Sequence, residues 1–234
     1  MSTSITPATS VDSALDGPVV VVPSSQSVAD LWERLGRIPL DRILLTPPTG
    51  TATEDDAADS RHTLGVSCEL VDGVLVAKAM GWYESRIAVT LAYFLESYLE
   101  VHKIGLVAGG DGPIRLFPKL VRKPDVSFVS FTRLPSAKIP RNKSLPVAPN
   151  LAVEVLSEGN TAGEMQRKLE EYFAAGVTIV WYIEPELQSA KAYTAVDQVE
   201  EIGPGGVLRG GDVLPGFELP LAKLFDKVGP REDA

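Results

Sequence analysis

Three polar residues have types and positions that could carry out chemistry together: Asp125, Glu154 and Lys168. Glu154 is the only charged residue in the run 151–157, LAVEVLS, whose composition is that of a strand buried on both faces. Burying an isolated carboxylate is costly, so Glu154 needs a cation or a metal ion beside it. Asp125 begins another predicted strand, directly after Pro124, and a neighbouring strand would bring it beside Glu154.

Two carboxylates placed side by side repel each other and invite a cation. Oxygen ligands, together with a single cysteine and only two histidines, favour Mg²⁺ or Mn²⁺ over zinc. Lys168 lies on the helix predicted after the Glu154 strand, one position before the apolar Leu169, so its stem could follow the core while its ammonium reaches the carboxylates. There it could orient a nucleophile or stabilise charge on a phosphate, and Tyr172, one helical turn further on, could fix its position.

Each of these residues, taken alone, also has a structural interpretation. An Asp can cap a strand end, a Glu and a Lys can form a structural salt bridge, and a helical Lys can face solvent. Along the chain they follow the order Pro-Asp, then Glu in an apolar strand, then Lys on the next helix. Coincidence explains this combined order much less well than it explains any one of the three residues alone.

The hydrophobic pattern predicts the elements that would position these residues. Helices are expected over 27–35, ended by Gly36, over 83–103, with Gly105 as its stop, and over 162–175, where Thr161 and Glu164 form a capping-box pattern. Strands are expected over 67–71 and 74–79, joined by an Asp72-Gly73 turn, and over 105–108, 114–117, 126–131, 151–157 and 177–183. An antiparallel continuation is expected over 190–194, 198–202 and 207–208, a closing turn or short helix over 221–225, and a loop over 46–60.

Length and composition indicate one globular domain over 26–234, preceded by a disordered or extended arm over 1–25. No apolar run approaches the ~18 residues that a membrane span needs, and the N-terminus has no signal-peptide pattern. The single cysteine, Cys68, agrees with a reducing compartment. We therefore expect a cytoplasmic protein without a membrane partner.

The net charge of −9 removes the broad attraction that draws basic proteins to nucleic acid. Any contact with phosphates would have to be local. The only clear basic run comprises Lys119, Arg122, Lys123, Arg133, Lys138, Arg141 and Lys143. A local binding patch and a solvated loop are both consistent with this run.

Six motifs, in sequence order, resemble those of the Uma-two family of restriction-endonuclease-like proteins, within the PD-(D/E)XK nuclease superfamily. They are ELVDG at 69–73, RKPDVSFV at 122–129, LAVEVLS at 151–157, KLEEY at 168–172, GV at 176–177 leading to VW at 180–181, and GDVLPGF at 211–217. Lys168 matches the variant of the superfamily in which the lysine has moved onto a helix. The resemblance covers roughly residues 65–225.

The resemblance implies an α/β (α+β) fold with a mixed β-sheet core flanked by helices, a homodimer, and Mg²⁺-dependent cleavage of DNA. It also implies that Glu69 joins Asp125 and Glu154 as a metal ligand, although a carboxylate at a hairpin edge is the structural alternative. The chain departs from its relatives at 80–86, where they often carry a Pro- and Ser-rich loop ending in a histidine. Arg86 or Glu84 could reach the cleft there or be an exposed residue of the first helical turn.

The leading hypothesis is an endodeoxyribonuclease in which Glu69, Asp125 and Glu154 hold Mg²⁺, with Mn²⁺ able to substitute, and Lys168 positions the attacking water. Arg122, Lys123 and Arg86 are the candidate substrate contacts. The alternative is a dimeric binding or regulatory module that keeps the nuclease fold without turnover. A glycosidase with paired carboxylates is disfavoured because the sequence offers no sugar-stacking aromatic groove.

Overall fold

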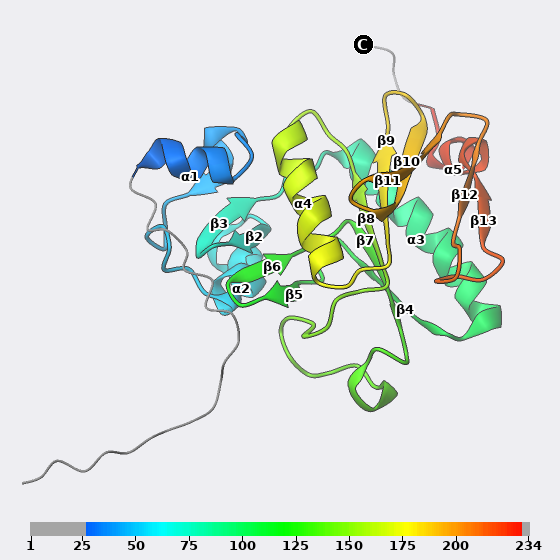
Figure 1. Ribbon diagram of the computed structural model, residues 1–234, viewed down its shortest axis with the longest axis horizontal. Coiled ribbons are helices and arrows are strands. Elements are labelled where there is room, and N and C mark those ends of the chain that lie inside the picture. Colours follow the sequence, from blue (N-terminus) through cyan, green and yellow to red (C-terminus); the bar gives the residue numbers. More distant parts are fainter. Residues whose placement is uncertain (1–26, 231–234) are drawn as a thin grey trace, which may run out of the picture.

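The computed structural model describes residues 27–230, and the arm predicted over 1–25 lies outside them. The described chain forms a six-stranded sheet, a five-stranded sheet and a two-stranded sheet. Figure 1 shows the five-stranded sheet on one side of the molecule and the six-stranded sheet on the other, with helix α4 (Ala162–Ala174) standing in front of the region between them. The predicted α+β class with a mixed sheet and flanking helices is confirmed.

The six-stranded sheet contains both predicted carboxylate strands. Its order is β11-β10-β9-β8-β7-β4, and only β8 and β9 run parallel, joined through α4 as the predicted strand, helix and strand unit. Its strands are β4 (Gly105–Gly109), β7 (Val126–Ser130), β8 (Leu151–Val155), β9 (Ile179–Glu184), β10 (Ser189–Ala195) and β11 (Gln198–Ile202). The register pairs Val126 of β7 with Val153 of β8, so the start of β7 lies beside the end of β8.

Helices cover both faces of this sheet. Val153 and Val155 belong to the large core that contains residues of α3 (Trp82–His102) and α5 (Leu221–Val228), whereas Ala152 packs with Leu169 and Tyr172 of α4. Successive side chains of a strand alternate between faces. Glu154 therefore points to the α4 side, the side from which Lys168 comes.

The five-stranded sheet has the order β1-β3-β2-β6-β5 and includes the predicted hairpin. Its turn has Asp72 and Gly73 at φ of 52° and 76°, the left-handed conformation that an Asp-Gly hairpin turn requires. The strands are β1 (Ile43–Leu44), β2 (Cys68–Val71), β3 (Val74–Ala77), β5 (Ile114–Phe117) and β6 (Leu120–Arg122). Helix α1 (Val28–Arg34) supplies Leu31 to one small core of this sheet, and α2 (Glu54–Leu64) supplies Ala57 to the other and contacts β2 and β6. Two short 3-10 helices lie at Leu40–Arg42 and Pro135–Ala137.

Three predictions about elements are wrong. The segment 46–60, predicted as a loop, contains the start of α2. Thr53 and Asp56 form a complete capping box at this start, but the helix buries too few apolar residues to produce a helical pattern in the sequence. Helix α3 ends at His102, and its C-cap is Lys103 in the left-handed conformation rather than Gly105, which opens β4. Strand β12 (Val207–Arg209) does not continue the large sheet but pairs with β13 (Glu218–Pro220).

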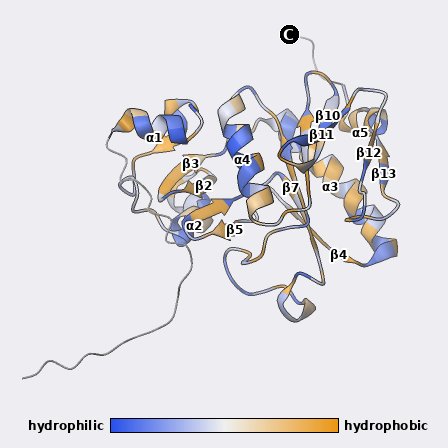
Figure 2. Ribbon diagram, viewed as in Figure 1, coloured by the Kyte–Doolittle hydropathy of each residue, from blue (hydrophilic) through white to orange (hydrophobic). Residues whose placement is uncertain are grey.

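Hydrophobic residues are distributed as this layering requires. Figure 2 shows hydrophobic and hydrophilic residues alternating along α3, which has one face on the core and one on solvent. Among the described residues, no helix is both long enough and apolar enough to span a membrane.

Candidate active site

Helix α4 brings Lys168 and Tyr172 to the buried carboxylate of Glu154. The Lys168 Nζ lies 3.1 Å from Glu154 Oε2, and the Tyr172 hydroxyl donates to Glu154 Oε1 at 2.5 Å. Lys168 and Tyr172 are four residues apart and so share one face of the helix. The predicted meeting of Glu154 with Lys168 is observed, and Tyr172 fixes the carboxylate rather than the lysine.

Glu69 joins this group from β2 of the other sheet. Its Oε2 lies 3.3 Å from Lys168 Nζ and accepts from Arg122 at 2.8 Å, while its Oε1 accepts from the backbone N–H of Lys123 at 3.0 Å. Arg122 also binds Glu171 of α4 at 2.5 Å. We call the five residues Glu69, Arg122, Glu154, Lys168 and Glu171 the buried charge network; it joins both sheets to α4.

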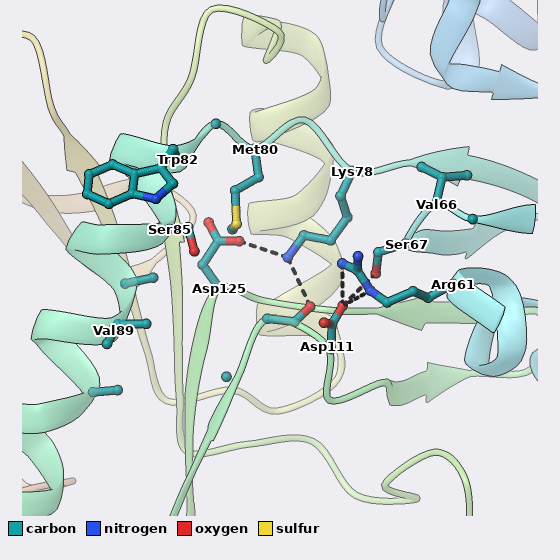
Figure 3. Close-up of a pocket in the computed structure, with 16 residues that line it drawn as sticks. Arg61, Val66, Ser67, Lys78, Met80, Trp82, Ser85, Val89, Asp111 and Asp125 are labelled. Atoms are coloured by element: carbon teal, nitrogen blue, oxygen red, sulfur yellow. Dashed lines mark hydrogen bonds and ion pairs between the residues drawn. The ribbon is translucent and has the colours of Figure 1, made fainter.

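Asp125 is held separately, at a cavity of about 600 Å³ between the sheets and α3. Its Oδ1 lies 2.8 Å from Lys78 Nζ, and its Oδ2 accepts from the backbone N–H of Val155 at 2.8 Å. Figure 3 shows Lys78 reaching Asp125 across the cavity, with Trp82 and Arg61 on opposite sides. Of the three residues that the sequence singled out, Asp125 alone lines this cavity.

Burial and nearby charges move the pKa values of the network in opposite directions. Burial raises the pKa of Glu154 to about 7, and the neighbouring Asp125 and Glu69 charges add to the rise that Lys168 opposes. Burial would raise the pKa of Glu69 too, but Lys168 and Arg122 outweigh it and hold that pKa well below its usual range. The same carboxylates raise the pKa of Lys168 against the effect of its burial. The three groups therefore strongly influence one another's protonation.

The predicted set of three carboxylate ligands is not assembled in this arrangement. Within residues 27–230, no three His, Cys, Asp or Glu side chains converge on a point where they could hold a metal ion. Glu69 and Glu154 are engaged by Arg122, Lys168 and Tyr172, whereas Asp125 faces a different cation. Around that cation, the oxygens of Asp125 and of two backbone carbonyls have the chemistry that a hard divalent cation prefers.

The predicted substrate contacts lie in places that the sequence did not indicate. Arg122 and Lys123 are each 2% exposed, so neither belongs to a basic surface patch; Lys123 donates to the carbonyl of Ala57 at 2.9 Å. Arg86 donates to the carbonyl of Lys227 on α5 at 2.9 Å. Their role as substrate ligands stays a prediction, and the contacts seen here are structural. Glu84 lines another cavity, together with Glu158, Glu184 and Glu186.

Lys78 is the residue that the sequence analysis missed. It follows β3 directly, within the segment 74–79 that was predicted as a plain strand. The one available signal was a lysine at the end of an apolar strand, VLVAK, which by itself resembles an ordinary solvent-facing strand end.

The fold is that of a nuclease-like domain. A crystal structure described as a putative nuclease belonging to DUF820, from Anabaena variabilis ATCC 29413, superposes with a TM-score of 0.62 at 18% identity, covering 70% of this chain and 92% of that chain. The Uma2 family model, described as "Putative restriction endonuclease", matches residues 58–222. The chain therefore belongs to the Uma2 family. No curated protein matches it.

Proposed function

We propose that the protein is a Mg²⁺-dependent endonuclease that hydrolyses phosphodiester bonds of DNA. The observation that carries the proposal is the contact of Lys168 with Glu154 in the strand next to Asp125, with Asp125 opening on a cavity. This order of Asp, strand Glu and helix Lys is the one expected of the nuclease superfamily that the sequence resembles. Membership of a family described as restriction endonucleases supports the same reaction class.

The positions of the chain's own groups suggest a separate role for each of them in the proposed reaction. Asp125 would hold the metal ion at the cavity. Glu154 and Glu69, the further predicted ligands, would reach the ion only by giving up their contacts with Lys168. When bound, Mg²⁺ supplies positive charge that stabilises the developing charge on a phosphoryl oxygen. Lys168 keeps Glu154 in place, and Tyr172 fixes the other Glu154 oxygen.

The cavity also offers exposed side chains that a nucleic acid strand could meet. Trp82 is 80% exposed and Arg61 is largely exposed, and the two lie on opposite sides of the cavity (Figure 3). An exposed indole can stack on a base and a guanidinium can bind a phosphate. Since the protein carries a net charge of −9, we propose that such local contacts replace a broad basic surface.

The test is cleavage of single-stranded, duplex and branched DNA by purified protein with Mg²⁺ or Mn²⁺. We expect cleavage by the wild type, its loss with a chelator, and its loss in an Asp125→Ala variant. A Lys191→Met variant, which removes one charge at a partly buried pair with Glu184 outside this cavity, serves as the control. Equal cleavage by the Asp125→Ala variant and the wild type would refute the assignment of the site.

A second candidate, a binding or regulatory module without turnover, is favoured by one observation: both oxygens of Asp125 already have partners within the protein. Calorimetric titration with Mg²⁺ and Mn²⁺ separates the two candidates. If neither the wild type nor a variant without the Lys78 ammonium binds Mg²⁺ or Mn²⁺, the binding module is favoured. Uptake that a Glu154→Gln variant loses favours the enzyme.

We also retain the predictions of a homodimer and of a cytoplasmic location. Sedimentation equilibrium of the full chain tests the first, because a dimer would give twice the mass of 25.1 kDa. Fractionation of cells that express the chain tests the second.

A further inference from the structure

Three oxygen atoms, two from the segment 123–125 and one from Gly110, converge on the ammonium group of Lys78. The carboxylate Oδ1 of Asp125 lies at 2.8 Å, the carbonyl oxygen of Lys123 at 2.5 Å and that of Gly110 at 3.3 Å. A lysine ammonium has three hydrogens to donate and no capacity to accept. These three oxygens therefore account for all the hydrogen bonds that Lys78 can make.

The same three oxygens are the ligand types of a hard divalent cation. Carboxylates and backbone carbonyls are the usual protein ligands of such ions, and a compact ammonium can stand in the same place with half the charge. The Asp125 and Lys78 side chains are only 4% and 7% exposed, so their attraction is weakly screened. A metal ion and the ammonium cannot occupy this place together.

We propose that Lys78 is an internal counter-cation that holds the place beside Asp125, so that a divalent metal ion binds there only when the Lys78 ammonium moves away. This inference rests on the proposed function in one respect, that Asp125 is a metal ligand. It adds that this chain's affinity for the metal is set by competition with one of its own side chains.

The surroundings give the ammonium somewhere to go. Lys78 lines the cavity of about 600 Å³, and so does Asp111, whose carboxylate follows Gly110 directly in the chain. Asp111 is largely exposed and holds Arg61 at 3.0 Å, so it is a carboxylate that an outward-turned lysine could share. A methyl group added at Gly110 would lie 3.2 Å from Lys78 Nζ, so the bound position of the ammonium is close-fitting.

The experiment is calorimetric titration of Mn²⁺ and Mg²⁺ into wild type, Lys78→Met and Lys78→Arg, in the absence of nucleic acid. We expect Lys78→Met to bind Mn²⁺ at least tenfold more tightly than the wild type, because the three oxygens lose their competitor. Lys78→Arg, which keeps a positive charge, should stay within a few-fold of the wild type. Lys191→Met removes a charge from a partly buried pair outside this cavity and should leave the affinity unchanged.

Thermal unfolding gives a second measurement that does not depend on activity. Without metal, Lys78→Met should unfold at a lower temperature than the wild type, since Asp125 loses its partner, and Mn²⁺ should raise that temperature more than in the wild type. If Lys78→Met does not fold without metal, the measurement is made on Lys78→Gln instead. The Gln amide keeps a hydrogen-bond donor for Asp125 but carries no charge. Adding Asp125→Asn to Lys78→Met should abolish the gain in affinity.

Equal or weaker Mn²⁺ binding by both Lys78→Met and Lys78→Gln would overturn the inference, as would a gain that survives Asp125→Asn. The failure of the proposed nuclease has a different signature, namely that metal binding tightens as expected but neither the wild type nor Lys78→Met cleaves DNA. If DNA is cleaved and the affinities are equal, only the role of Lys78 is refuted.

Discussion

Glu69 and Asp125 are both buried carboxylates that pair with a cation, yet they differ in what lies beside them. Glu69 is enclosed by Arg122, Lys168 and a backbone N–H, all inside the buried charge network. Asp125 pairs with Lys78 at the wall of a cavity. An enclosed pair can be broken only by exposing or unpairing a charge, whereas a pair at a cavity can exchange one cation for another.

The comparison teaches that burial alone does not identify a working carboxylate. Both side chains are almost wholly shielded from solvent, at 1% and 4% exposure. The network ties two sheets to α4, and removing one member leaves uncompensated charge. Asp125 lines a cavity, which is the access that the proposed reaction needs. Each of the following predictions probes this difference.

The largest expected effect is on stability, in an Arg122→Met variant. Removing the guanidinium leaves Glu69 and Glu171 without their shared partner, and breaking a buried ion pair in this way costs about 3–5 kcal/mol. Urea unfolding followed by circular dichroism measures the change. A loss below about 1 kcal/mol would mean that the network is not the enclosed structure described above.

The next effect is on activity, in an Asp125→Asn variant. We expect cleavage of DNA to fall by about 10²–10³-fold, the range for removing one electrostatic group from an active site, because the amide gives up the negative charge at the cavity. The matched control is Asp197→Asn, which makes the same change at an exposed carboxylate in the turn between β10 and β11, outside this cavity. If both variants lose the same amount of cleavage activity, Asp125 has no special role in the reaction.

A third prediction concerns pH and the pair of Arg42 with Glu164, an enclosed pair one turn from Lys168 on α4. Burial would raise the pKa of Glu164, but the hydrogen bonds from Arg42 outweigh it, so the folded pKa lies below the ordinary 4.5. The stabilisation is therefore present above pH 4.5 and is lost as the pH falls through the folded pKa. The difference in unfolding free energy between wild type and Glu164→Gln should shrink as the pH is lowered from 7 into this range.

That difference is measured by urea unfolding at a series of pH values. Cleavage by Glu164→Gln, assayed under conditions where the variant is folded, should stay close to the wild type. A pH-independent difference would show that the pair does not depend on the Glu164 charge.

The smallest expected effect is at Arg209, which pairs with Glu218 at 3.3 Å on the surface. The side chains are 54% and 63% exposed, so an Arg209→Met variant should lose less than about 1 kcal/mol. Because the substitution is the same as in Arg122→Met, the pair of measurements isolates the effect of burial. A loss equal to that of Arg122→Met would contradict the comparison.

The sequence predicted most of the elements because their signals are local. The Asp72-Gly73 turn, the long apolar face of α3 and the Thr161 cap of α4 each lie within a few residues of the structure that they specify. Helix α2 was missed because its signal is a cap without an apolar face. Only half of the capping box predicted for α4 forms. The Thr161 side chain accepts from the Glu164 backbone N–H, but the Glu164 carboxylate binds Arg42, 122 residues away in the chain, instead of the Thr161 backbone N–H.

What the sequence determined by itself was that Glu154 must have a partner and that Lys168 lies on the neighbouring helix, because a charge in an apolar strand is costly wherever the strand packs. The tertiary structure decided the rest. It gave Glu69 to Arg122, enclosed Lys123, and set Lys78 against Asp125, 47 residues away. Ion pairs between distant strands depend on how the two sheets meet, and no local pattern encodes that meeting.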